Sequence, residues 1–133
     1  MARRITPFLM FEGKAEEAMD FYRSLFPDSR VDKLERFGPD GPGAEGTILH
    51  AELVLADQRL RLFDSPVPHA FGFTPSFSLF VDCESEAEID RLSESLSDGG
   101  EVMMALAEYP FATKFTWLAD RFGVSWQLSL GAR

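Results

Sequence analysis

Three residues in the first half of the chain, His50, Glu52 and Asp64, could carry acid–base or metal chemistry. An imidazole titrates near neutral pH and can act as a general base, and two carboxylates can pair for proton transfer or bind a divalent cation. His50 and Glu52 are two residues apart, so in a strand they lie on one face. The simpler interpretations are a histidine hydrogen-bonded within a sheet and carboxylates on a solvated sheet face.

The elements that must position these residues follow from a strand-then-helix pattern that returns after about half the chain. Residues 5–26 are echoed by residues 75–96. In the first copy, the short apolar run 5–11 predicts a strand, and apolar residues at three- and four-residue steps over 14–26 predict an amphipathic helix that Pro27 ends. The chain therefore reads as two copies of one module.

Three further strands are expected in the first module, at 29–37, 47–55 and 59–64, with the Gly/Pro-rich loop 38–46 between the first two. The segment 47–55 alternates in hydrophobicity. The apolar face expected to meet the helix holds Leu49, Ala51, Leu53 and Leu55.

The second module repeats this order. A strand is expected at 76–82, followed by a helix that starts with a capping box at Ser85 and Glu88. The remaining strands are expected at 101–107, 112–118 and 124–130, the last two joined by a turn at 120–123. The predicted fold is α+β, with two βαβββ modules forming curved mixed sheets in one domain: residues 1–65, a linker at 66–75 and residues 76–133.

Composition narrows the function classes. With 133 residues, 45% of them hydrophobic, the chain can bury a real core. Its net charge of -9 argues against binding to nucleic acid or to an anionic membrane. The single cysteine, Cys83, has no partner for an internal disulfide and no basic neighbour to activate it, so an inert thiol and a cytoplasmic location are expected. The apolar run 5–11 is too short for a signal peptide or a membrane span.

At the level of motifs, the chain resembles the PhnB-like branch of the vicinal oxygen chelate superfamily, which includes glyoxalase I and bleomycin resistance proteins. The resemblance rests on the stretches FLMFEGKAEEAMDFYRSLF, ILHAELVLADQRLRLFDS, SFSLFVDCESEAEIDRL and WLADRFGVSWQLSL, and it covers nearly the whole chain. It implies two half-barrels, often completed across a homodimer, whose concave faces form a cup for a small molecule. Members of this branch are often labelled as 3-demethylubiquinone 3-methyltransferase-like, but no Gly-rich loop of the Rossmann type follows a strand here.

Enzymes of this superfamily hold a divalent metal with four side chains. The resemblance places those four positions at Pro7, Asp64, Ser76 and Gln127. Only Asp64 is a good ligand, because proline has no donor atom, serine binds divalent metals poorly and glutamine offers one neutral oxygen. We therefore expect no metal cofactor, with a divalent metal as the alternative.

Strand alternation predicts which other side chains line the ligand face. That face is expected to be mostly apolar with a few polar groups, as is typical of small-molecule sites. The expected members are Leu9, Phe11, His50, Glu52, Leu62, Asp64, Ser76, Ser78, Phe80, Trp117 and Gln127.

Three functions remain open. The first is a metal-free small-molecule-binding protein, for which the acidic charge would suit a cationic ligand. The second is an enzyme of the glyoxalase, dioxygenase or isomerase type, or the methyltransferase of the family label, using His50, Glu52 and Asp64, with His50 and Glu52 as catalytic candidates. The third is a structural homodimer without a ligand.

Overall fold

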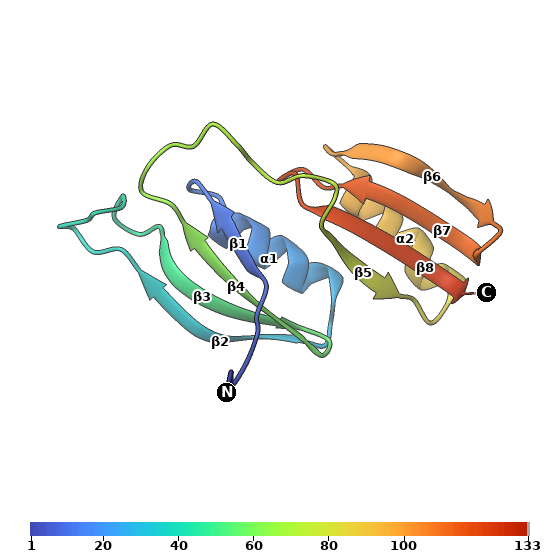
Figure 1. Cartoon of the computed structure of the whole chain (residues 1–133), viewed down its shortest axis with the longest axis horizontal. Coiled ribbons are helices and arrows are strands. Elements are labelled where there is room, and N and C mark those ends of the chain that lie inside the picture. The colour runs from blue at the N-terminus through green and yellow to red at the C-terminus, as the bar shows by residue number, and fades with distance from the viewer. Residues whose placement is uncertain (133) are drawn as a thin grey trace. The chain divides into compact units, whose positions relative to one another are not determined.

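The chain folds into two compact units, and the computed structural model describes residues 1–132 (Figure 1). The first unit runs from Met1 to Ala70, and the second begins at Phe71. Each unit contains one four-stranded sheet and one helix in the order βαβββ. The predicted α+β fold of two repeated modules is therefore confirmed.

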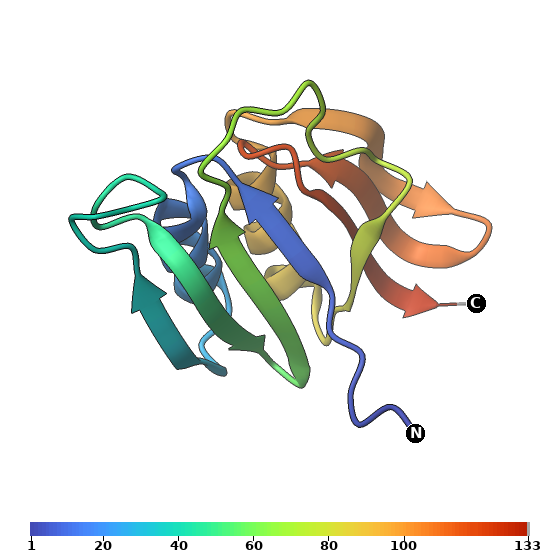
Figure 2. The same ribbon diagram turned by 60° about the vertical axis from the view of Figure 1, so that its left-hand side comes forward.

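The first unit is a mixed sheet with one helix against it. Its elements are β1 (Phe8–Phe11), α1 (Ala15–Leu25), β2 (Ser29–Arg36), β3 (Ile48–Leu55) and β4 (Gln58–Asp64). The strand order is β1-β4-β3-β2, with β1 and β4 parallel and the other pairs antiparallel. Figure 2 shows α1 along one face of this sheet, which leaves the other face uncovered within the unit.

The helix α1 buries the apolar stripe that the sequence predicts. Its buried residues are Ala15, Ala18, Met19, Tyr22 and Leu25. On the sheet, Leu53, Leu60 and Leu62 are fully buried and complete this core. Because burial of a large apolar side chain contributes about 1.5–3 kcal/mol, this helix–sheet contact holds the unit together.

One residue of β3 departs from the predicted alternation. Leu49 is 42% exposed, whereas the preceding Ile48 is fully buried. The pairing with β2 shifts at this point, because Glu35 lies opposite His50 but Arg36 lies opposite Ile48. A bulge of this kind adds one unpaired residue and turns the side chains that follow it. The prediction that Leu49 meets the helix is therefore wrong.

The second unit repeats the arrangement. Its elements are β5 (Ser78–Asp82), α2 (Glu86–Ser97), β6 (Glu101–Tyr109), β7 (Ala112–Ala119) and β8 (Ser125–Ala132). The order is β5-β8-β7-β6, with β5 and β8 parallel, and α2 buries Ile89, Leu92 and Leu96 against the sheet. Within residues 1–132, no helix is both long and apolar enough to span a membrane.

Two polar residues fix the ends of elements in the second unit. Ser85 caps α2, with its Oγ accepting the N–H of Glu88 at 3.1 Å. The Glu88 carboxylate accepts the N–H of Glu84 at 2.8 Å, one residue earlier than a capping box requires. Asp120 closes the predicted turn before β8, because its Oδ1 accepts the backbone N–H groups of Phe122 at 2.8 Å and Val124 at 3.1 Å. Its Oδ2 accepts the indole N–H of Trp126 at 2.9 Å. Trp126 is only 1% exposed and belongs to the core of the second unit.

Candidate functional site

Asp64 lies at the end of β4, with its carboxylate surrounded by backbone N–H groups. Its Oδ1 accepts hydrogen bonds from Gly13 at 2.8 Å and Ala15 at 3.0 Å, and its Oδ2 accepts one from Ile48 at 2.8 Å. Only 3% of the residue is exposed. The first N–H groups of a helix have no partner within the helix and favour a negative charge. Asp64 therefore ties the start of α1 to β3 and β4.

The register of β3 against β4 separates Asp64 from His50 and Glu52. Residues directly opposite one another in an antiparallel pair share a face, and Glu52 lies opposite Arg61. Because side chains alternate along β4, Arg61 and Asp64 point to opposite faces, Asp64 toward α1. The predicted grouping of Asp64 with His50 and Glu52 on one ligand face is therefore wrong.

Three more of the predicted ligand-face residues lie on the α1 side. Leu62 is fully buried, and Leu9 and Phe11 are each 4% exposed. Leu9 lies opposite Leu62 and Phe11 opposite Asp64 in the β1–β4 pair, so all four belong to the helix-facing side. The prediction failed for these residues because β1 is apolar on both faces, and its alternation does not show which face meets the helix.

His50 lies on the face away from α1, and its Nε2 is a hydrogen-bond acceptor. Arg61 donates to it through Nε at 2.9 Å, and Arg61 Nη2 lies 2.8 Å from the same atom. Because a guanidinium only donates, the imidazole is neutral and carries its proton on Nδ1. Burial, together with the charges of Arg61 and Lys33, lowers the pKa of His50 below its ordinary value. The lone pair that a general base needs is thus directed at Arg61.

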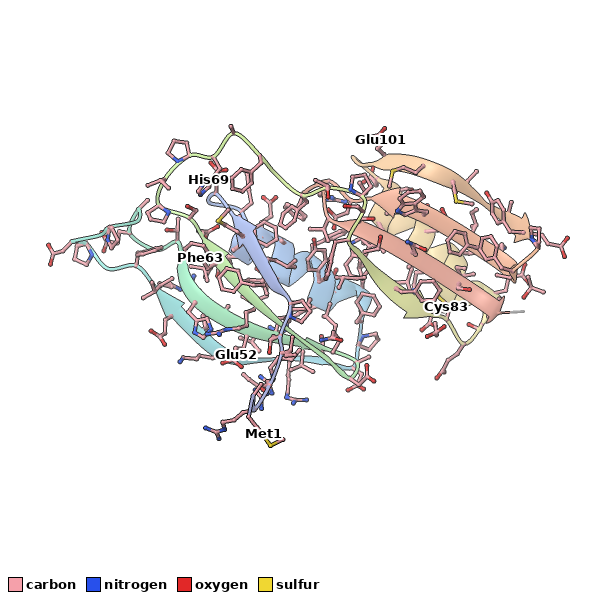
Figure 3. All side chains as sticks on the ribbon, in the orientation of Figure 1. Met1, Glu52, Phe63, His69, Cys83 and Glu101 are labelled. Atoms are coloured by element: carbon pink, nitrogen blue, oxygen red, sulfur yellow. The ribbon has the colours of Figure 1, made fainter. Side chains whose placement is uncertain are left out.

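Glu52 belongs to an ion-pair network on the same face. Its Oε1 accepts a hydrogen bond from Arg59 Nη1 at 2.9 Å and lies 3.9 Å from Arg4 Nη1. Figure 3 labels Glu52 on the first sheet. Arg59 also donates through Nη2 to Asp32 at 2.8 Å. The Glu52 carboxylate is therefore engaged by arginine side chains.

The second sheet carries a row of side chains on its face away from α2. Gln127 on β8 lies opposite Phe80 on β5 and Trp117 on β7, and Trp117 in turn lies opposite Met104 on β6. Phe80 is 55% exposed, and Trp117 and Gln127 are partly exposed. The register thus brings together three of the residues that the sequence assigned to the ligand face.

Hydrogen bonds between side chains fix the polar members of this row. The Trp117 indole N–H donates to Ser125 Oγ at 2.9 Å, and Ser125 Oγ lies 2.7 Å from Ser78 Oγ. Gln127 Nε2 donates to Ser78 Oγ at 3.2 Å. Ser125, at 1% exposed, is the central residue of this cluster and was missing from the predicted set. Its alternation with Gln127 along 124–130 is the sequence signal that could have identified it.

The four positions that the resemblance assigns to metal offer few free donor atoms. Pro7 contributes only its carbonyl oxygen, which accepts the N–H of Arg61 at 2.9 Å, and Ser76 Oγ lies 2.9 Å from Thr74 Oγ1. Asp64 accepts three backbone hydrogen bonds. Across residues 1–132, no group of three or more His, Cys, Asp or Glu side chains is arranged to hold a metal ion. The donor set therefore does not fit a divalent metal.

The helix N-termini offer little to an anionic cofactor. Asp64 occupies the N–H groups of Gly13 and Ala15 at the start of α1. Ser85 and Glu88 satisfy N–H groups at the start of α2. Nucleotide-like cofactors often place their phosphates at such N-termini, so neither helix provides the usual cradle for one.

Comparison with known proteins identifies close relatives. Residues 3–129 match the family model described as 3-demethylubiquinone-9 3-methyltransferase. A solved structure from Bacillus cereus, described as a putative 3-demethylubiquinone-9 3-methyltransferase and PhnB protein, is 52% identical; the match covers 97% of this chain and 100% of that one, with a TM-score of 0.94. The structure of protein PA1353 from Pseudomonas aeruginosa is 30% identical, with 98% of each chain covered and a TM-score of 0.84.

A more distant neighbour shares the fold. The glyoxylase/bleomycin resistance protein/dioxygenase domain from Frankia sp. EAN1pec is 17% identical over 100% of this chain and 95% of that one, with a TM-score of 0.66. At that identity the likeness concerns the fold alone. It agrees with the fold that the sequence motifs implied.

Proposed function

The chain belongs to the PhnB-like family described as 3-demethylubiquinone-9 3-methyltransferase, and from this premise and the site geometry we propose that it binds a small organic molecule without a resident divalent metal. The proposed binding surface is the face of the second sheet that carries Phe80, Trp117 and Gln127. We call it the Trp117 face.

One observation carries this proposal: the hydrogen-bonded cluster that holds Trp117 and Gln127 side by side. Ser125 fixes the edge of the indole, and Ser78 fixes the amide of Gln127. Aromatic rings beside a few fixed polar groups are the usual composition of a small-molecule site. Gln127 Nε2 has a second N–H, and its Oε1 can accept, so the face can pair with a donor or an acceptor on a flat ligand.

The alternative function was an enzyme that uses His50, Glu52 and Asp64. The sheet separates Asp64 from the other two residues, and arginines engage both His50 and Glu52. This geometry favours binding over acid–base chemistry at these residues. The methyl transfer named in the family description would require a methyl donor, and no Gly-rich loop of the Rossmann type follows a strand in this sequence.

The test is a binding screen that reads Trp117 directly. Flat aromatic compounds, neutral and cationic, are screened for a rise in the unfolding midpoint, because a ligand that binds only the native state stabilises it. Hits are then titrated by tryptophan fluorescence in wild type, and their affinities for wild type and Trp117→Phe are compared by isothermal titration calorimetry. The buried Trp126 provides the constant background signal.

Two matched variants localise the binding. Gln127→Leu should lower the affinity for a hit by about tenfold, the cost of losing one hydrogen bond to the ligand. Gln58→Leu, at the exposed start of β4 in the first unit, should leave that affinity unchanged. Equal affinity of wild type, Gln127→Leu and Trp117→Phe would reject the Trp117 face as the site.

We also propose that the protein works as a cytoplasmic homodimer. Several large apolar side chains are exposed on the single chain, among them Phe71, Phe77 and Val102. Exposed apolar patches often mark protein interfaces. Light scattering coupled to size-exclusion chromatography would give the mass, and a monomer at micromolar concentration would reject the dimer.

A further inference from the structure

Arg61 is a cation without a carboxylate partner on the first sheet. Other cations of this sheet are paired with carboxylates. Arg59 donates to both Glu52 and Asp32, and Lys33 Nζ lies 3.2 Å from Glu35 Oε1. Among residues 1–132, Arg61 forms no ion pair with any Asp or Glu side chain, and its partner is the neutral ring of His50. Arg61 therefore has no carboxylate within ion-pair distance, although Glu52 lies across from it on β3, in a chain whose net charge is -9.

The contact with His50 also sets the direction in which Arg61 can bind. A guanidinium has five N–H groups in a planar fork. His50 Nε2 engages Nε and Nη2, on one side of the fork. The Nη1–Nη2 edge remains available, and two parallel N–H groups on such an edge match the two oxygens of a carboxylate.

Aromatic rings lie next to this charged group. Phe8 on β1 is directly opposite Arg61, and Phe63 is two residues further along β4 on the same face. The two ring centroids are 5.5 Å apart, and 53% of Phe8 is exposed. The face thus offers two neighbouring aromatic rings, tilted by 52° to each other, beside a cation held by His50.

We infer that Arg61 and the Phe8–Phe63 pair form a second ligand site, which takes an aromatic carboxylate. The carboxylate binds the Nη1–Nη2 edge of Arg61, and the ring packs on Phe8 and Phe63. His50 is a positioning residue, because it holds the guanidinium without neutralising it. This site lies on the first unit and does not rest on the function proposed for the Trp117 face. The net charge of the chain favours cationic ligands, whereas this site is proposed to bind an anion.

The test is an NMR titration of the full chain with benzoate, and with neutral benzamide as the matched probe. Benzoate should shift the Arg61 Nε–Hε signal and the backbone amides of Phe8 and Phe63, and benzamide should not. Arg61→Gln should weaken benzoate about tenfold or more, because a charge-assisted pair is lost. Arg121→Gln, which removes a guanidinium paired with Asp98 in the second unit, is the matched control and should bind benzoate as wild type does.

The role of His50 is tested separately. His50→Phe removes the acceptor and should weaken benzoate, while His50→Gln restores an acceptor and should recover most of the affinity. The dispersed spectrum of each variant shows whether it is folded. Benzoate binding that is equal in wild type and Arg61→Gln, or benzamide binding as tight as benzoate, would overturn the proposal. An absence of benzoate shifts in the folded wild-type protein would overturn it as well.

Discussion

Asp64 Oδ2 accepts the backbone N–H of Ile48 at 2.8 Å, and this contact assigns the carboxylate a structural role. Its other oxygen holds two N–H groups at the start of α1. Asp64→Ala would leave three donors without their acceptor, so we expect a loss of about 3 kcal/mol or more in the free energy of unfolding. Urea unfolding measures this. Asp40→Ala, in the exposed loop before β3, should change stability by less than about 0.5 kcal/mol.

Metal should not stabilise this protein. The protein is first treated with a chelator, and Mn, Fe, Co, Ni or Zn is then added singly. The unfolding midpoint should stay unchanged, and no stoichiometric metal should be found per chain. Of Pro7, Asp64, Ser76 and Gln127, only Asp64 has a charged side chain, and backbone N–H groups already occupy it. A metal that binds only the native state would raise the midpoint. Stoichiometric binding of an added metal to the wild-type protein, lost in His50→Ala, would contradict the metal-free proposal.

Ser125 should matter for both stability and binding in the second unit. Its hydroxyl is buried and accepts the indole N–H of Trp117 at 2.9 Å. Ser125→Ala should cost about 1–3 kcal/mol, because that N–H loses its partner, and should change the tryptophan fluorescence. Ser93→Ala, on the partly exposed surface of α2, is the control. An unchanged emission spectrum in folded Ser125→Ala would show that the cluster does not hold Trp117.

The thiol of Cys83 should be unreactive in the folded protein. Burial, with a smaller effect of the Glu88 charge, raises the pKa of Cys83 to about 12. Near neutral pH the thiolate fraction then falls on the order of a thousandfold, and thiol reagents react with the thiolate. Modification should be slow in buffer and fast in denaturant. As a control, the double variant Cys83→Ser, Ala87→Cys carries its thiol at an exposed position and should react rapidly in both conditions.

His50 should make the protein less stable as the pH falls. Its pKa in the folded state is lowered by burial first and then by Arg61 and Lys33, so the unfolded chain binds the proton more readily. Stability should therefore decline as the pH drops below the ordinary histidine pKa of about 6.5, until the lowered folded pKa is passed. Unfolding midpoints between about pH 5 and 8 check this. His50→Gln should flatten that part of the curve, and an unchanged curve in folded His50→Gln would contradict the prediction.

Much of the fold could be predicted from the sequence, because hydrophobic period depends only on local spacing. The α1 stripe from Ala15 to Leu25 and the alternating run 124–130 each specify an element and its buried side. The capping residue Ser85 was likewise readable from its type and position. These features depend on neighbours within a few residues along the chain.

Strand register and the partner of each charge depended on tertiary structure. The sequence places Asp64 and Glu52 on strands, but the pairing of Glu52 with Arg61 decides that they lie on opposite faces. It could not show that His50 would accept from Arg61, or that Ser125 would join Trp117 to Ser78. Such contacts join residues on separate strands, so only the folded sheets decided which side chains meet. The sequence by itself determined the repeated modules and their cores, because those depend on local hydrophobic spacing.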